Sequence, residues 1–190
     1  SRSSAASDVY NRQLFISTPE NLKNLEEIRL NNLRNAKLIN DGKVSSIGKK
    51  SIVWLSYNVH GNETSGTEAA LNTYYKLMTD KNFDVLLKDL IIIIDPCLNP
   101  DGRERYTNWL TSRSGTKADT NPWAREHQEP WPGGRANHYY FDLNRDWAWQ
   151  TQVESKARLA LYNQWLPQVH VDFHEQRVNN PYYFASAACL

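Results

Sequence analysis

Short apolar runs alternate with helical periodicities along the chain, and this order predicts an α/β fold. The runs SIVWLSY from Ser51, LIIIID from Leu90 and QVHVDF from Gln168 are rich in β-branched and aromatic residues, which favours strands. LIIIID is apolar at all but its last position, as expected for a central strand that is covered on both faces. A shorter strand is predicted at residues 14–17.

Between these runs, capping signals mark where helices begin. Thr18 is the predicted N-cap of a first helix and Pro19 its first residue, a position that proline favours. Ser65 and Glu68 form a capping-box signature for a second helix. The apolar residues expected to face the core are Leu22, Leu25, Ile28 and Leu33 in the first helix and Ala70, Leu71, Tyr74, Leu77 and Met78 in the second.

The remaining chain continues the alternation. Helical spacing returns from Val153 to Trp165, with Ala157, Ala160 and Leu161 on the same stripe, and PYYFA from Pro181 reads as the start of a further strand. A strand, a helix and a second strand in succession are typical of a parallel crossover. No internal repeat or domain boundary is visible, so residues 9–190 are predicted to form one domain, and residues 1–8 (SRSSAASD) a linker or tag remnant.

One interval fits neither pattern. From Thr111 to His138 the chain is rich in glycine, proline, tryptophan and charge without any period, and it is too long for a simple connection. Such intervals are often functional loops. Asn99 and Asp101, just after the LIIIID strand, are predicted to shape a tight turn.

Composition narrows the class of protein. The chain has 190 residues, 40% hydrophobic and 23% charged, which is ordinary for a globular domain. Lys and Arg number 22 against 21 Asp and Glu, and no basic stripe is present, which argues against nucleic acid as a partner. The longest apolar runs are far short of a membrane span. Cys97 and Cys189 are compatible with a disulfide or with two reduced core thiols, and the sequence leaves both open.

Side chains that could bind a metal ion lie where predicted strands end. His60 and Glu63 follow the strand from Ser51, and His174 follows the strand from Gln168. Loops at the carboxyl ends of parallel strands converge, so two imidazoles and one carboxylate would form the His₂Glu set of a catalytic zinc site. The spacing H-x-x-E alone is common by chance. His170 is predicted to be a hydrogen-bonded core histidine, and His127 and His138 polar surface groups.

Four motifs in a fixed order strengthen this hypothesis: HGNETSG at 60–66, LNPDG at 98–102, GGRANHYYFDLNRDW at 133–147 and VDFHEQ at 171–176. Together they resemble the zinc carboxypeptidase family of carboxypeptidase A and B-like exopeptidases, over most of the chain from about Leu14. The resemblance implies an α/β fold with a mixed, largely parallel central sheet and helices on both faces. It also implies that residues 9–190 are a partial catalytic domain, incomplete at the C-terminus, with the N-terminal boundary left open.

The resemblance assigns roles at the metal. It implies that His60, Glu63 and His174 bind one zinc ion, and that Asp142 orients a ligand histidine. The family's general-base glutamate lies well downstream of the second zinc histidine, so the expectation is that this chain alone binds zinc without turning over peptides. Glu175, next to His174, is expected to point away from the metal because side chains alternate along a strand.

The resemblance also assigns roles at the substrate. Asn144 and Arg145 are expected to hold the terminal carboxylate of a peptide. Arg135 is expected to polarise the scissile carbonyl, as in the regulatory branch of the family, with Arg113 as the alternative.

The implied function is hydrolysis of the C-terminal peptide bond of peptides or proteins. The implied partner is a peptide or protein C-terminus, with no nucleic acid and no membrane, and the family implies a secreted or periplasmic location. Two alternatives stay open. One is an N-acyl amino acid deacylase of the succinylglutamate desuccinylase and aspartoacylase type, which shares HGNE-like and DLNR-like motifs. The other is a zinc-binding pseudopeptidase without turnover.

Overall fold

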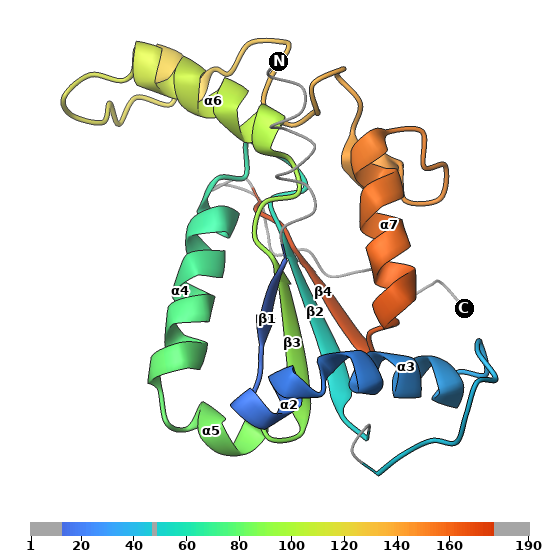
Figure 1. The fold of residues 1–190 in the computed structure, drawn as a ribbon. Coiled ribbons are helices and arrows are strands. Elements are labelled where there is room, and N and C mark those ends of the chain that lie inside the picture. The colour runs from blue at the N-terminus through green and yellow to red at the C-terminus, as the bar shows by residue number, and fades with distance from the viewer. Residues whose placement is uncertain (1–12, 47–48, 177–190) are drawn as a thin grey trace, which may run out of the picture.

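Within the part of the chain that the structure describes, four strands form one central sheet in the order β1-β3-β2-β4 (Figure 1). In this computed structural model, which describes residues 13–46 and 49–176, the strands are β1 (Leu14–Ile16), β2 (Ser51–Tyr57), β3 (Leu90–Asp95) and β4 (Val169–Phe173). β1 pairs antiparallel with β3, whereas β2 pairs parallel with both β3 and β4. The predicted mixed, largely parallel sheet is therefore confirmed, and so is the placement of LIIIID inside it.

Helices and two 3₁₀ turns connect the strands. They are α2 (Pro19–Lys23), α3 (Leu25–Asn35), α4 (Ser65–Thr79), α5 (Phe83–Leu86), α6 (Pro100–Arg113), η1 (Arg125–His127), η2 (Leu143–Arg145) and α7 (Val153–Trp165). Among the described residues, no helix combines the length and apolar character needed to cross a bilayer. The predicted strand from Pro181 and the residue Cys189 lie outside the described residues.

The core has two layers because successive side chains of a strand point to opposite faces of the sheet. Ile92 and Ile94 of β3 pack in one cluster with α4 and α5. Ile91 and Ile93, which alternate with Ile92 and Ile94 along β3, pack in the other cluster with α3 and α7. Figure 1 shows α4 and α7 on opposite sides of the sheet. Helices on both faces, as predicted, are therefore confirmed.

The first predicted helix is divided in two. The Thr18 hydroxyl caps α2 as predicted and accepts from the Asn21 amide at 3.3 Å. The helix then breaks at Asn24, and α3 begins at Leu25. Leu22 was expected in the core but is exposed, and Asn21 is buried instead. The Asn21 side chain donates a hydrogen bond to the buried Leu87 carbonyl at 3.1 Å. A polar residue therefore pairs with a buried backbone group here, where the sequence pattern predicted an apolar contact.

The capping box predicted for α4 is wrong. The N-cap is Thr64, and its side chain makes no capping hydrogen bond. Ser65 donates from its backbone nitrogen and its hydroxyl to Glu175 Oε1, at 2.7 and 2.5 Å. Glu68 instead accepts from Arg103 at 2.7 Å. A carboxylate distant in sequence therefore takes the free donors at this helix end.

The buried faces of α4 and α7 are also narrower than predicted. In α4, Ala70 and Leu77 are buried, but Leu71 and Met78 are 54% and 59% exposed, and Tyr74 is also exposed. In α7, Trp165 is buried as predicted, whereas Val153 is exposed. The side chains of α7 buried in its place are polar: Glu154, Ser155 and Arg158.

Helix α6 replaces the predicted tight turn. The Asn99 side chain caps it by accepting from the Gly102 amide at 2.9 Å, and Pro100 and Asp101 occupy its first turn. An asparagine, a proline and an acidic residue in succession are ordinary helix-start signals. The sequence therefore contained the signal for α6, and the predicted loop begins only after Arg113.

Three glycines allow three backbone segments to meet above the sheet. A Cβ on Gly61 would collide with the backbone of Gly102 and Arg103, and a Cβ on Gly102 would collide with the Gly134 carbonyl oxygen. A Cβ on Gly134 would lie 2.5 Å from the Gly102 carbonyl oxygen. Only glycine fits here, because backbone atoms cannot move aside as a flexible side chain can.

Gly102→Ala is expected to lower the free energy of unfolding by about 2–3 kcal/mol, in the range of overpacked cores. The matched control is Gly115→Ala, whose added Cβ would meet its nearest atom at an ordinary 3.7 Å. Urea unfolding of both variants measures the difference. Equal stability of the two variants would show that the three segments do not pack as described.

A buried charge cluster lies between α7 and the end of β3. Asp95 and Arg158 are each 3% exposed. The Arg158 guanidinium lies over the Trp147 ring, 3.6 Å from its centroid, and donates to the Leu143 carbonyl at 3.3 Å. Burial raises the pKa of Asp95 to about 7, although the Arg158 charge opposes this shift.

Asp95→Asn is expected to reduce the pH dependence of stability. The unfolded carboxyl ionises near pH 4, whereas folded Asp95 keeps its proton until about pH 7. The folded state binds more protons between these values, so this contribution is complete below about pH 4 and is lost as the pH rises to about 7. The loss is at most about 4 kcal/mol.

Urea unfolding at about pH 5 and about pH 8 tests this expectation. Wild type should lose more stability between the two conditions than Asp95→Asn does. The exposed Asp84→Asn is the matched control and should behave as wild type. If all three proteins show the same pH dependence, the raised pKa of Asp95 is wrong.

Candidate metal centre

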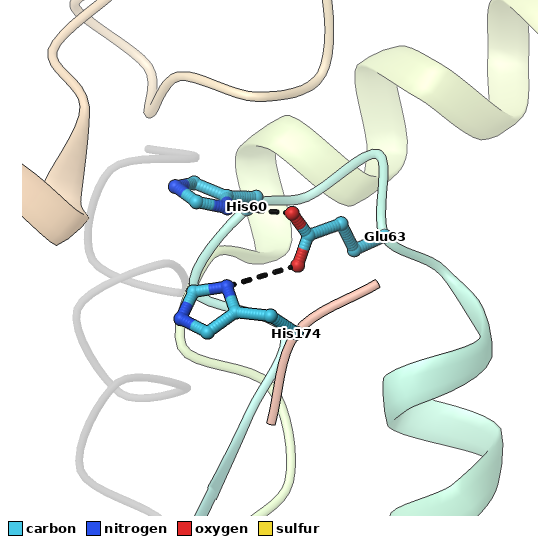
Figure 2. Close-up of side chains that lie close together, drawn as sticks. All are labelled: His60, Glu63 and His174. Carbon is cyan, nitrogen blue, oxygen red and sulfur yellow. Dashed lines mark hydrogen bonds and ion pairs between the residues drawn. The ribbon is translucent and has the colours of Figure 1, made fainter. Parts of the chain in front are cut away.

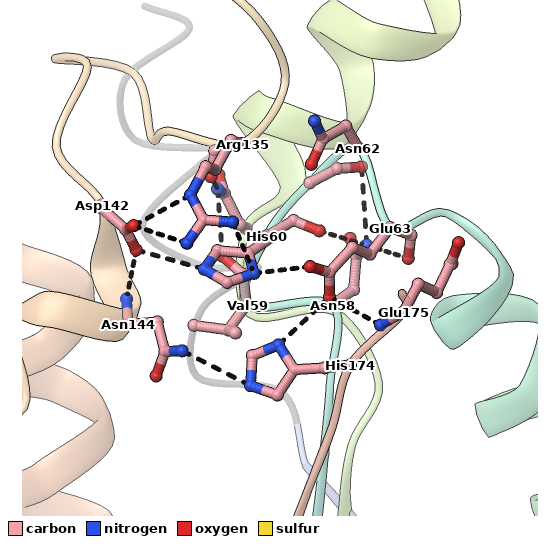
Figure 3. A network of polar contacts seen from close by, with 12 residues as sticks. Asn58, Val59, His60, Asn62, Glu63, Arg135, Asp142, Asn144, His174 and Glu175 are labelled. Atoms are coloured by element: carbon pink, nitrogen blue, oxygen red, sulfur yellow. Dashed lines mark hydrogen bonds and ion pairs between the residues drawn. The ribbon is translucent and has the colours of Figure 1, made fainter. Parts of the chain in front are cut away.

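The loop after β2 is built around one asparagine. Asn58 adopts a positive φ of 60°, a conformation that asparagine tolerates better than most residues. Its side-chain nitrogen donates to the His60 carbonyl at 2.9 Å and to the Glu63 carbonyl at 2.8 Å. The chain therefore turns around a buried amide, and His60 and Glu63 project from the same turn (Figure 3).

Two imidazoles and one carboxylate converge at this turn. His60 Nδ1 lies 2.7 Å from Glu63 Oε1, and His174 Nδ1 lies 3.1 Å from Glu63 Oε2 (Figure 2). One ligand atom from each of the three residues lies within 4.8 Å of the others. His174 comes from the end of β4, 111 residues after Glu63. The donor types fit a catalytic zinc site, which takes three protein ligands and leaves a fourth position open.

The electrostatics favour positive charge between these residues. Burial opposes ionisation of Glu63, but the hydrogen bonds from His174 and His60 outweigh it and lower the pKa of Glu63 to about 2. Hydrogen bonds to Asp172 and Glu63 raise the pKa of His174 to about 10. The same carboxylates that favour a proton on His174 would favour a divalent cation beside its Nδ1.

Asp142 holds the other nitrogen of His60. Its Oδ1 lies 3.2 Å from His60 Nε2 and also accepts from the Asn144 backbone amide at 2.9 Å. Its Oδ2 accepts from Arg135 Nε at 3.0 Å. The structure therefore places Asp142 both as the partner of a candidate ligand and as the cap of η2.

Arg135 and Asn144 contact the converging histidines, and Arg145 follows Asn144 in η2. Arg135 Nη1 lies 3.4 Å from His60 Nδ1, and Asn144 Nδ2 lies 3.5 Å from His174 Nε2 (Figure 3). Arg145 is exposed and donates to the Asn144 carbonyl at 3.2 Å.

Arg113, the alternative to Arg135, lies elsewhere. It ends α6 and lines a cavity of about 300 Å³ that is bounded by Trp109, Trp123, Arg125, Gln128 and Pro130. The structure brings Arg135, and not Arg113, into contact with His60.

Comparison with known proteins agrees with this geometry. The family model of the zinc carboxypeptidases matches residues 17–169, most of the chain. The chain belongs to this family. The resemblance read from the four motifs is thereby confirmed, and membership supports a zinc carboxypeptidase type of function and implies zinc. A comparison with curated proteins found no match.

The zinc carboxypeptidase match and the structure complement each other. The matched range contains His60, Glu63, Asp142 and Arg135, but it ends at Val169, before His174. The structure shows that His174 also lies at the candidate site, because β4 pairs parallel with β2 and brings His174 to Glu63.

The side chains of the other residues singled out from the sequence of this zinc carboxypeptidase chain make no described contact with His60, Glu63 or His174, although the Glu175 backbone nitrogen donates to Glu63 Oε2 at 3.1 Å. The Glu175 carboxylate is bound at the start of α4 and does not face His60 or His174, as strand alternation predicted. His170 Nε2 lies 3.0 Å from Ser56 Oγ, and burial lowers the pKa of His170. His127 and His138 are exposed, as predicted.

Sequence analysis missed the side chains that hold the site in shape. Asn58 was overlooked, and Asn99 was read only as a turn residue. Asn99 Nδ2 donates to the Val59 carbonyl at 3.3 Å and to the Arg135 carbonyl at 3.1 Å. The available signal was the position of the two asparagines in the loops that follow predicted strands, Asn58 directly after one and Asn99 four residues after the other, where converging loops leave backbone carbonyls to satisfy.

Proposed function

We propose that the chain supplies the zinc-binding and substrate-binding residues of a zinc metallocarboxypeptidase, an enzyme that hydrolyses the C-terminal peptide bond of peptides or proteins. One zinc ion would be held by His60 Nδ1, Glu63 and His174 Nδ1. The observation that carries the proposal is the convergence of these three side chains, from two distant segments, in a member of the zinc carboxypeptidase family.

When bound, zinc supplies a Lewis acid that polarises a carbonyl and lowers the pKa of a water molecule. The residues around it orient the reaction. Arg135 is fixed by Asp142 through Nε and Nη2, each 3.0 Å from Oδ2, and keeps Nη1 beside His60. In this position Nη1 would donate to the scissile carbonyl oxygen as negative charge develops on it.

Asn144 and Arg145 would admit substrates that end in a free carboxylate. The Arg145 guanidinium is exposed, and its described hydrogen bond uses Nη1 alone. Its remaining N–H groups match the fork of a carboxylate, which forms strong charge-assisted pairs with arginine. The Asn144 amide, beside His174, would complete the carboxylate contact next to the reacting bond.

Exposed aromatic residues support a peptide substrate over a small N-acyl amino acid. Trp131, Tyr140 and Phe141, in the segment that carries Arg135 and Asp142, are between 50% and 84% exposed. They offer contact area to a chain that extends beyond the terminal residue, which a deacylase substrate would not reach. The secreted or periplasmic location implied by the family stays a prediction.

The purified protein is expected to bind about one zinc ion per chain through His60, Glu63 and His174. Metal analysis after dialysis should show that His60→Ala, Glu63→Ala and His174→Ala each lose most of it. His127→Ala removes an exposed histidine and is the matched control. Unchanged zinc content in the first three variants would contradict the assignment.

Peptides with a free C-terminus are expected to bind the zinc-loaded protein more tightly than the matched amides. Arg145→Ala should weaken binding of the free acid by roughly 10–100-fold, as expected for a lost hydrogen bond to a charged group. Isothermal titration calorimetry measures both peptides. Arg113→Ala is the matched control, because Arg113 is also exposed but lies at the end of α6.

Three outcomes of this binding experiment would change the proposed role of Arg145 or the proposed function. Equal binding of acid and amide by wild type would contradict the carboxylate role of Arg145. Loss of the preference in Arg113→Ala would transfer that role to Arg113. Tighter binding of an N-acyl amino acid than of a longer peptide would favour the deacylase.

A further inference from the structure

The second histidine of the proposed site has a carboxylate partner that the sequence reading did not assign. His174 Nε2 lies 3.3 Å from Asp172 Oδ2. His60 Nε2 lies 3.2 Å from Asp142 Oδ1. In both histidines Nδ1 faces Glu63 and Nε2 faces an aspartate.

The contact of Asp172 follows from the geometry of β4. Asp172 belongs to β4 and His174 directly follows its last residue, Phe173; in extended chain, residues two apart point to the same side, in agreement with the contact between the two side chains. The Asp172 side chain is 23% exposed, and its Oδ1 is buried without a hydrogen-bond partner among the described residues. The Asp172 oxygen that contacts His174 is therefore Oδ2. Asp172 belongs to β4, and a strand is more rigid than a loop.

Arg158 provides positive charge behind this pair. It is buried, and its charge acts on both Asp95 and Asp172. Its Nε and Nη1 have no hydrogen-bond partner among the described residues. The charge of Arg158 also interacts with Asp146 and Glu154, so this buried arginine compensates negative charge that burial would otherwise penalise.

Asn144 also approaches His174 Nε2, at 3.5 Å, but the two neighbours require different tautomers (Figure 3). An amide N–H donates only to an unprotonated Nε2, whereas Asp172 accepts from a protonated one. If Nδ1 binds a metal, Nε2 of the neutral ring carries the proton, and Asp172 is then its acceptor. This tautomer also frees the Asn144 amide for substrate.

We propose that Asp172 is the positioning residue of His174: it accepts the Nε2–H, fixes the ring and leaves the Nδ1 lone pair for the metal, as Asp142 does for His60. The proposal rests on the zinc site of the proposed function. Carboxylate partners of metal-binding histidines fix the tautomer and raise ligand basicity, and their loss typically lowers metal affinity 10–100-fold.

Zinc titration of the metal-free protein against a competing chelator tests the proposal. Asp172→Asn is expected to raise the zinc Kd by roughly 10–100-fold, as is Asp142→Asn. Asp84→Asn, an exposed aspartate of α5, is the matched control and should bind zinc as wild type. Circular dichroism checks folding, and Asp172→Ser is the second variant if Asp172→Asn does not fold.

A double-mutant comparison separates positioning from a general structural effect. In a His174→Ala background, Asp172→Asn should have no further effect on the residual zinc Kd, whereas Asp142→Asn should keep its effect. Equal loss of affinity from Asp172→Asn in both backgrounds, or no loss in the wild-type background, would overturn the proposal. Failure of wild type to bind zinc would instead overturn the proposed function.

Discussion

Backbone carbonyls in the loop after β2 and at Arg135 need hydrogen-bond donors, and the side chains of two asparagines, Asn58 after β2 and Asn99 after β3, supply them. Asn58 donates into the turn that carries His60 and Glu63. Asn99 donates to the Val59 carbonyl and to the Arg135 carbonyl, and its Oδ1 caps α6. A buried amide left without partners is costly, so these contacts fix the path of three segments at once. The positions of the candidate metal ligands depend on them.

The close approach of the same segments follows from this arrangement. Gly61, Gly102 and Gly134 place backbone against backbone, with no side chains between. Glu129 strengthens the junction by accepting from the Asn62 side chain at 2.8 Å and from the Gly134 amide. The site is therefore formed where the main chains of two loops and of the first turn of α6 pack directly against one another. Such close packing suits a site in which small displacements of a ligand or donor weaken function.

How much could be predicted depended on where each signal lies. Local patterns gave the strands, since LIIIID and SIVWLSY need no distant partner to be recognised, and strand ends predicted where His60 and His174 would meet. The misses came from distant contacts. Glu175 took the role that Glu68 was expected to play, and Asn21 was buried because carbonyls after α5 needed donors. No local periodicity encodes such partners. Helix α6 is different, because its start signals were present in Asn99 and Pro100 and were read as a turn.

Helix α7 buries polar residues, and for this reason its apolar periodicity predicted the wrong buried face. A helix that covered only the sheet would bury apolar residues, yet α7 buries Arg158 against Asp95 and the Trp147 ring. Burying such a cluster seldom adds stability compared with apolar packing of similar volume. The charge of Arg158 acts on Asp172, and Asp172 Oδ2 lies 3.3 Å from His174 Nε2, so the cluster extends to a candidate metal ligand. The departure from the apolar pattern therefore lies beside a candidate metal ligand, where a functional requirement is expected to outweigh apolar packing.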